Sequence, residues 1–150
     1  MYKIDKKDRL ILNILNNNCR ESNTKIGKIV GLSRDSVAYR INNLEKEGVI
    51  ENYTIEINYD ELGYTAYSFA IKLQNVSQEA EEKIISFLTK NKKIVFLEKT
   101  LSKYDLAFII LTKSLKEINE EIKSIRQFIG INLKYLEIGI SLETYEFPTF

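Results

Sequence analysis

Hydrophobic positions near the start of the chain recur with the period of an α-helix. Asp5 is predicted to cap this first helix, with Asp8 three residues later as the acidic partner of a capping box. The asparagines at positions 16–18 end the helix, because their side chains compete for backbone hydrogen bonds. The apolar side chains on its predicted inner stripe are Leu10, Ile11, Ile14 and Leu15.

Two further helices are predicted before residue 50. The second covers residues 24–30 and ends at Gly31, where a glycine closes a helix at little steric cost. Ser33 is predicted to cap the third helix, which continues to about Glu47. The side chains expected to face inward from these two helices are Ile26, Ile29, Val30, Val37, Ile41 and Leu44. Two helices joined by so short a turn indicate a helix-turn-helix.

After Gly48 the helical period gives way to an alternation of apolar and polar positions. The apolar members are Val49, Ile50, Tyr53, Ile55, Ile57 and Tyr59. This alternation predicts a strand over residues 49–59. Residues 1–60 are therefore predicted to form a winged, or strand-extended, helix-turn-helix domain.

The rest of the chain, residues 61–150, predicts a second domain in which strands and helices are mixed. Strands are predicted over residues 64–73, 94–101, 104–112 and 133–142. Helices capped by Ser77 and Ser114 are predicted to reach Lys90 and Ile129. Their expected inner side chains are Ala80, Ile84, Phe87, Leu88, Leu115, Ile118, Ile122, Ile125 and Ile129. The order βαββαβ predicts a ferredoxin-like sandwich and an α+β fold class, with two helices on one face of an antiparallel sheet.

Composition narrows the class of protein. Hydrophobic residues make up 44% of the 150 positions and charged residues 29%, as in globular proteins. The longest apolar run, residues 106–111, is far shorter than the roughly 20 residues that a membrane span needs. The first residues lack the apolar core of a signal peptide. We expect a cytoplasmic protein with no membrane partner.

The absence of histidine removes much catalytic chemistry. Neither a Ser-His nor a Cys-His nucleophile can form, and no histidine is available to bind a metal. The single cysteine, Cys19, can form neither an intrachain disulfide nor a multi-thiolate zinc site. We therefore expect no enzyme, no metal site and no cofactor.

The charge pattern points to the helix-turn-helix. The whole chain has a net charge of +1, but residues 20–44 hold an excess of three positive charges. The third helix and its neighbourhood carry groups suited to phosphates and base edges: Lys25, Lys28, Ser33, Arg34, Asp35, Ser36, Tyr39, Arg40 and Asn43. We predict a double-stranded DNA partner, contacted mainly by Arg34, Ser36, Tyr39 and Arg40. A helical hairpin in a core, or a winged helix that docks on protein, remains the alternative.

A specific set of spaced residues runs through the first domain and into the second: Ile4, Asp5, Asp8, Ile11, Leu12, Leu15, Asn18, Arg20, Ser22, Ile26, Val30, Gly31, Leu32, Ser33, Val37, Arg40, Ile41, Leu44, Glu45, Gly48, Ile50, Tyr53, Thr54, Leu62 and Gly63. This spacing resembles the Lrp/AsnC (leucine-responsive, feast/famine) transcription regulators over nearly the whole chain. The resemblance implies an N-terminal DNA-binding domain and a RAM (ACT-like) sensing domain. It also implies dimers, tetramers or octamers, with amino acids as common effectors. Some relatives are haem-precursor decarboxylases that use histidines, which this chain lacks.

The two-fold symmetry of such dimers predicts a pseudo-palindromic operator. The resemblance places an effector site at the turn between the second and third strands of the sensing domain: Thr100, Leu101, Ser102, Lys103, Tyr104 and Asp105. Asp105 would accept the ammonium group of an amino acid, and turn amides or Lys103 would bind its carboxylate. The family has glycine where this chain has Ser102, whose Cβ would crowd the ligand. We expect weak amino-acid binding or a different small molecule.

The second domain carries more apolar strand residues than two helices are expected to cover: Tyr67, Phe69, Ile71, Phe96, Phe108, Ile110, Ile138 and Ile140. A sheet that is apolar on both faces usually packs against another layer. The second domain is therefore predicted to be the assembly platform of a homo-oligomer. The apolar tail, residues 145–150, is predicted to dock on a partner subunit.

Overall fold

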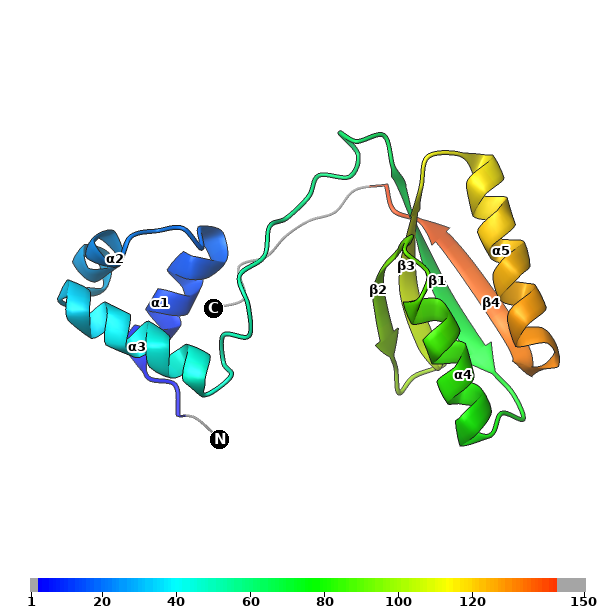
Figure 1. The fold of residues 1–150 in the computed structure, drawn as a ribbon, viewed down its shortest axis with the longest axis horizontal. Coiled ribbons are helices and arrows are strands. Elements are labelled where there is room, and N and C mark those ends of the chain that lie inside the picture. Colours follow the sequence, from blue (N-terminus) through cyan, green and yellow to red (C-terminus); the bar gives the residue numbers. More distant parts are fainter. Residues whose placement is uncertain (1–2, 143–150) are drawn as a thin grey trace. The chain divides into compact units, whose positions relative to one another are not determined.

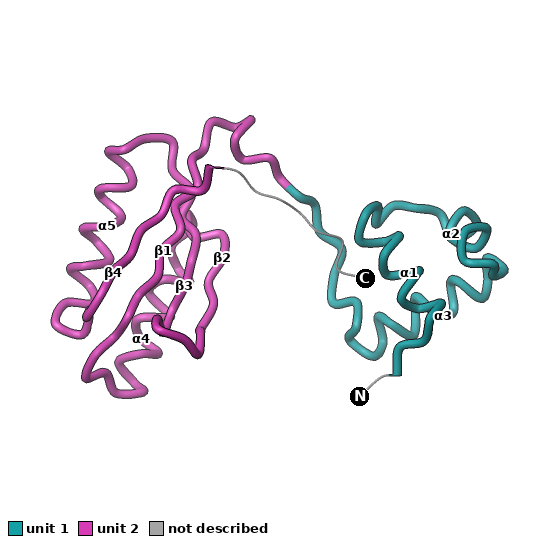
Figure 2. Tube along the Cα trace, turned by 180° about the vertical axis from the view of Figure 1, so that it is seen from behind, with its two compact units in different colours: residues 1–56, 145–150 teal, residues 57–144 magenta. Residues whose placement is uncertain are grey.

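The structure, a computed structural model, describes residues 3–142. They divide into two compact units, residues 3–56 and residues 57–142 (Figure 2). The first unit holds three helices, and the second holds a four-stranded sheet with two long helices (Figure 1). The predicted docking of residues 145–150 lies outside the described residues.

Local capping signals define the three helices of the first unit, which are α1 (Lys6–Asn17), α2 (Asn23–Val30) and α3 (Arg34–Lys46). The Asp5 carboxylate accepts hydrogen bonds from the backbone N–H groups of Lys7 and Asp8, and Asp8 accepts one from the Asp5 N–H. Ser22 and Ser33 cap α2 and α3. These caps satisfy N–H groups that a helix start otherwise leaves unpaired.

The turn between α2 and α3 needs glycine at two positions for different reasons. Gly31 has a φ of +68°, a left-handed conformation that side chains with a Cβ rarely adopt. A Cβ on Gly27 would lie 2.6 Å from the carbonyl oxygen of Leu32, so α2 and the turn could not approach as they do. Together the two glycines allow the short connection that the sequence predicts.

The core of the first unit confirms most, but not all, of the predicted inner positions. Its buried members are Ile11, Leu15, Ile26, Val30 and Val37. Leu10 and Ile29, predicted to face inward, are 46% and 59% exposed. Each is adjacent in sequence to a buried residue. Three short helices bury only a narrow stripe on each helix, so these two neighbours of the stripe remain exposed.

The structure contradicts the strand predicted over residues 49–59. The described residues form no strand there, and no backbone hydrogen bond joins residues 51–58 to another segment within residues 3–142. A strand requires a neighbour with which to exchange hydrogen bonds, and the alternating pattern does not specify that neighbour. In the described part of the chain the helix-turn-helix therefore has no strand-built wing.

The second unit has the predicted α+β, ferredoxin-like fold. Its elements are β1 (Thr65–Leu73), α4 (Gln78–Thr89), β2 (Ile94–Lys99), β3 (Leu106–Thr112), α5 (Leu115–Ile129), the 3-10 turn η1 (Gly130–Asn132) and β4 (Leu133–Ile140). The strands are antiparallel in the order β2-β3-β1-β4. Both helices lie on one face of the sheet (Figure 1).

The helices cover more of the apolar strand residues than the sequence predicts. Of the eight apolar strand residues counted as too many for two helices to cover, five are buried in the unit's own core: Tyr67, Phe69, Ile71, Phe108 and Ile110. The rings of Phe69 and Phe108 stack there with centroids 4.9 Å apart. Leu115, predicted to face inward, is 71% exposed at the start of α5.

The face of the sheet away from the helices has small side chains at its centre. The strand register places Ala70 of β1 beside Ala107 of β3 and Glu137 of β4, and Ser68 beside Ile109 and Gly139. Because side chains alternate along a strand, these residues share the side opposite the Phe69–Phe108 core. Small side chains therefore form the centre of the uncovered face.

Candidate nucleic-acid interface

The side of α3 that faces away from the core forms an open, largely polar surface. Val37 and Leu44 are buried beneath it, whereas Tyr39 is 68% exposed. Asp35, Tyr39 and Asn43 follow one another at intervals of four residues and therefore share a side of the helix. With Leu32, Ser36 and Arg40 they line an open hollow of about 520 Å³.

The first turn of α3 is held firmly by its serines. The Ser36 N–H donates to the Ser33 hydroxyl at 3.1 Å, and the two hydroxyls lie 2.8 Å apart. Both residues are exposed, so the capped helix end faces solvent. A helix N-terminus attracts anions through its unpaired N–H groups and its dipole. This end of α3 therefore suits a phosphate.

Arg40 is engaged within the protein, a role that its sequence position does not indicate. Its Nη1 donates to Asp5 Oδ2 and to Asp8 Oδ1, both at 2.7 Å. The Asp8 side chain is only 2% exposed. Hydrogen bonds from Arg40 to these carboxylates raise its pKa, while the Asp8 N–H, followed by Arg40, lowers the pKa of Asp5. Arg40 thus links α3 to the capping box of α1.

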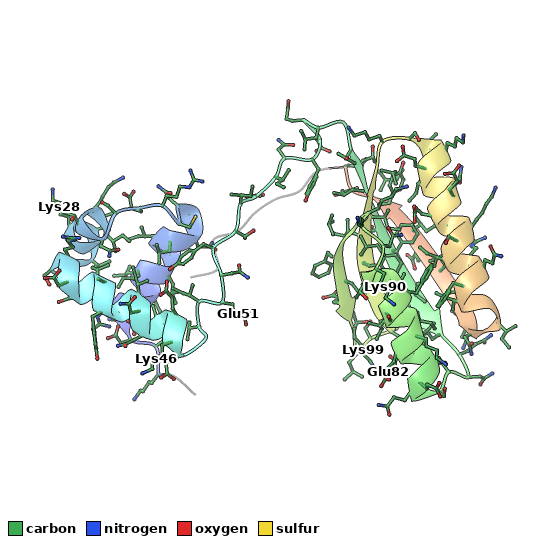
Figure 3. The ribbon with its side chains drawn as sticks, viewed as in Figure 1. Lys28, Lys46, Glu51, Glu82, Lys90 and Lys99 are labelled. Atoms are coloured by element: carbon green, nitrogen blue, oxygen red, sulfur yellow. The ribbon has the colours of Figure 1, made fainter. Side chains whose placement is uncertain are left out.

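The remaining cations predicted to contact DNA differ in whether they form an ion pair within the described residues. Lys25 forms an ion pair with Glu21 at 2.5 Å. Lys28 and Arg34 are exposed and form no ion pair with any residue of the described range 3–142. Lys28 projects away from α2 (Figure 3). Arg34 lies at the first position of α3, so its free cation is placed at the N-terminal end of the open side of the helix.

Tyr53 contributes a contact that the sequence does not signal. Its hydroxyl donates to Glu45 Oε1 at 2.7 Å, joining the segment after the helices to α3. Partial burial and the neighbouring Glu45 carboxylate raise the pKa of Tyr53 to about 12. The phenol therefore keeps the proton that it donates in this hydrogen bond at neutral pH.

The six residues of the predicted effector site lie together in the turn between β2 and β3. Thr100 Oγ1 donates to the Tyr104 carbonyl at 2.7 Å, and the Ser102 hydroxyl accepts from the Tyr104 N–H at 3.3 Å. Leu101 is fully exposed, and the Lys103 ammonium lies 5.0 Å from the Tyr104 ring. Among described residues only Asn75 combines a side chain with a positive φ, so Ser102 has an ordinary backbone conformation.

Asp105 is directed into the protein. Its carboxylate accepts hydrogen bonds from Lys72 Nζ and from the Leu73 N–H, each at 2.7 Å. Burial opposes ionisation, but these two donors outweigh it and lower the pKa of Asp105. The carboxylate predicted to bind an ammonium group already has a cationic partner.

Residues 3–142 contain no group of three or more acidic or cysteine side chains placed to hold a metal ion. No helix in this range has the length and apolar character required to cross a membrane.

The first domain matches the AsnC-type helix-turn-helix domain over residues 4–45. The HTH-type transcriptional regulator FL11 of Pyrococcus abyssi is 30% identical over 147 residues, covering 97% of this chain and 96% of the relative. Escherichia coli AsnC superposes with a TM-score of 0.83 at 22% identity, covering 99% of both chains. A Neisseria meningitidis transcriptional regulator, NMB0573, solved as an L-Met complex, superposes with a TM-score of 0.85 at 16% identity, covering 98% of this chain and 95% of that one.

The relationship to FL11 extends through both units, and the fold of each unit agrees with it. The capped α3 and its open polar side are the parts that a helix-turn-helix presents to a DNA groove. The chain belongs to the Lrp/AsnC family of DNA-binding transcription regulators.

Proposed function

We propose that this regulator binds a pseudo-palindromic operator as a dimer or larger assembly, with the open side of α3 placed in the major groove. The observation that carries the proposal is the capped, solvent-facing start of α3 beside a row of polar side chains. The proposed contacts are Lys28, Ser33, Arg34, Asp35, Ser36, Tyr39 and Asn43, with Lys25 at the margin. Arg40 is proposed to orient α3 rather than to contact DNA.

The Arg34→Ala variant tests the placement of DNA on α3. Arg34 is exposed and carries no intramolecular ion pair within residues 3–142, so its loss should leave the fold intact. Because each subunit of the proposed dimer loses one phosphate contact, binding to all sequences should weaken and the slope of log affinity against log salt should fall by about 2. Affinity is measured by fluorescence anisotropy across a salt series.

The matched control is Arg126→Ala, which removes an equal charge from the exposed surface of α5 in the second unit. It should leave affinity and salt slope as in the unmodified protein. An Arg34→Ala variant with unchanged affinity and slope would move the DNA interface away from the start of α3.

Dimer formation is proposed to use two features that have no partner within residues 3–142. One is the uncovered sheet face around Ala70 and Ala107. The other is the segment 51–58, whose backbone groups have no strand partner in the described chain. Pairing of this segment with a second copy would satisfy those groups and account for the alternating pattern.

A small-molecule effector is proposed to act at the turn of residues 100–105, since the Neisseria regulator of the same fold is an L-Met complex. In this chain the Asp105 carboxylate is bonded to Lys72 and Leu73. An amino-acid ammonium group would have to displace Lys72. Weak binding of common amino acids, or preference for another small molecule, is therefore the proposed property of this site.

Thermal unfolding of the full chain with each of the twenty amino acids tests the effector proposal. A ligand present at 100 times its Kd would add about 2.7 kcal/mol of stability. We expect no common amino acid to reach that value at a concentration 100 times a micromolar Kd, and Ser102→Gly to enlarge the shift for at least one. Ser102→Ala is the control, because it removes the hydroxyl and keeps the Cβ. Micromolar binding by the unmodified protein would contradict the steric role given to Ser102.

A further inference from the structure

The open side of α3 contains one acidic residue, Asp35, on the surface that is proposed to contact the negatively charged DNA. Asp35 is the second residue of the helix and is exposed. Asp35 forms no ion pair with a cation in residues 3–142. By contrast, Asp5 and Asp8 at the start of α1 both pair with Arg40. A free carboxylate therefore faces the surface proposed to meet a polyanion.

DNA offers a carboxylate few favourable positions. An ionised carboxylate only accepts hydrogen bonds, and phosphates repel it. In the major groove the donors are the amino groups of cytosine and adenine, and Asp or Glu characteristically accepts from cytosine N4. The first residues of a recognition helix are those that reach base edges. The position of Asp35 matches this role.

The side chains that follow Asp35 along α3 are also suited to contact base edges. Asp35, Tyr39 and Asn43 line the same hollow and share one side of α3. Eight residues of helix rise about 12 Å, which is the length of three to four base-pair steps of about 3.4 Å. Such a row can present chemically different groups to successive bases.

We propose that Asp35 is a specificity-determining residue that selects cytosine at one position of each operator half-site. This inference rests on the proposed contact between α3 and DNA. The carboxylate accepts a hydrogen bond from cytosine N4 at the preferred site. Elsewhere it has no donor and repels phosphate, so it lowers affinity for unrelated sequences.

A purely structural role for Asp35 makes a different prediction. An acid in the first turn stabilises a helix by interacting with the positive end of its dipole. If that were the whole function, removal of the carboxylate would lower the thermal stability and weaken binding to all sequences equally. The preferred operator sequence would then be unchanged.

The experiment is selection of bound sequences from a random double-stranded DNA pool at fixed salt, with the full chain and its Asp35→Asn and Asp35→Ala variants. The unmodified protein should select cytosine about tenfold or more over other bases at one position per half-site. Asp35→Asn should change that preference to adenine, because an amide can bond adenine N6 and N7 together. Asp35→Ala should lose the preference and bind unrelated DNA more tightly.

The control Glu47→Gln removes an acidic charge from the exposed C-terminal end of the same helix and should leave every selected base unchanged. An unchanged preference in both Asp35 variants would overturn the inference while leaving DNA binding by α3 in place. Cytosine selection absent from the unmodified protein would overturn it as well. Failure of the unmodified protein to select any sequence would overturn the proposed function together with this inference.

Discussion

The Arg40→Ala variant is expected to lose about 2–3 kcal/mol of stability in the first unit. Removal of Arg40 leaves the almost fully buried Asp8 carboxylate without the cation that lies 2.7 Å away. Breaking a fully buried ion pair costs about 3–5 kcal/mol. The expected loss is smaller because the Arg40 side chain is 27% exposed, so water can reach the carboxylate that it leaves behind.

Native-state hydrogen exchange of the α1 and α3 amides measures this loss in the first unit alone. Arg34→Ala is the matched control, since it removes the same side chain from the same helix without breaking an intramolecular ion pair; it should change stability by less than about 0.5 kcal/mol. The two variants should also differ in DNA binding. Under conditions in which both variants are folded, only Arg34→Ala should reduce the slope of log affinity against log salt. An Arg40→Ala variant with unchanged exchange and a reduced salt slope would make Arg40 a DNA contact after all.

The Ala70→Arg variant is expected to prevent dimer formation at micromolar concentration. Ala70 lies on the central strand β1, opposite Ala107, on the sheet face that the helices leave uncovered. An arginine there can extend into solvent in a monomer but would place a bulky charge at the centre of a packed interface. Because linked half-site binding is lost, operator affinity should fall about 100-fold or more.

Light scattering gives the molar mass, and circular dichroism checks that the second unit remains folded. The added positive charge would by itself favour DNA, so a loss of affinity cannot arise from general electrostatics. The control Asn119→Arg adds the same charge on the exposed surface of α5 and should keep both the dimer and its affinity. A folded Ala70→Arg protein with the mass of the unmodified assembly would place the interface elsewhere.

Local signals in the sequence were sufficient to predict most elements of both units. Ser33, Ser77 and Ser114 each precede a helix that they cap in the structure. A cap acts over three residues, so its geometry depends on little beyond the adjacent chain. The βαββαβ order followed from the succession of period-two and helical segments, and the family resemblance followed from the spacing of packed residues in the first domain.

The faces of the sheet required the tertiary structure. Alternation separates two sets of side chains on each strand but does not say which set the helices cover. Tyr67 and Phe69 belonged to the set counted as too large for the helices to cover, yet they lie in the unit's own core. Residues 49–59 had the alternation of a strand but have no neighbouring strand in the described part of the chain. Pairing is a property of two segments, so one segment's pattern does not specify it.

Only the tertiary structure determined which charges are free to act. Arg40 meets Asp5 and Asp8 across more than thirty residues of sequence, and Asp105 meets Lys72 across 33. Residue type specified what each group can bond, while folding decided whether a partner was already present. By itself the sequence determined the helices of the first unit and the βαββαβ order of the second. Folding left Arg34 and Asp35 exposed and gave Arg40 and Asp105 partners within the protein, because an ion pair depends on distance in space.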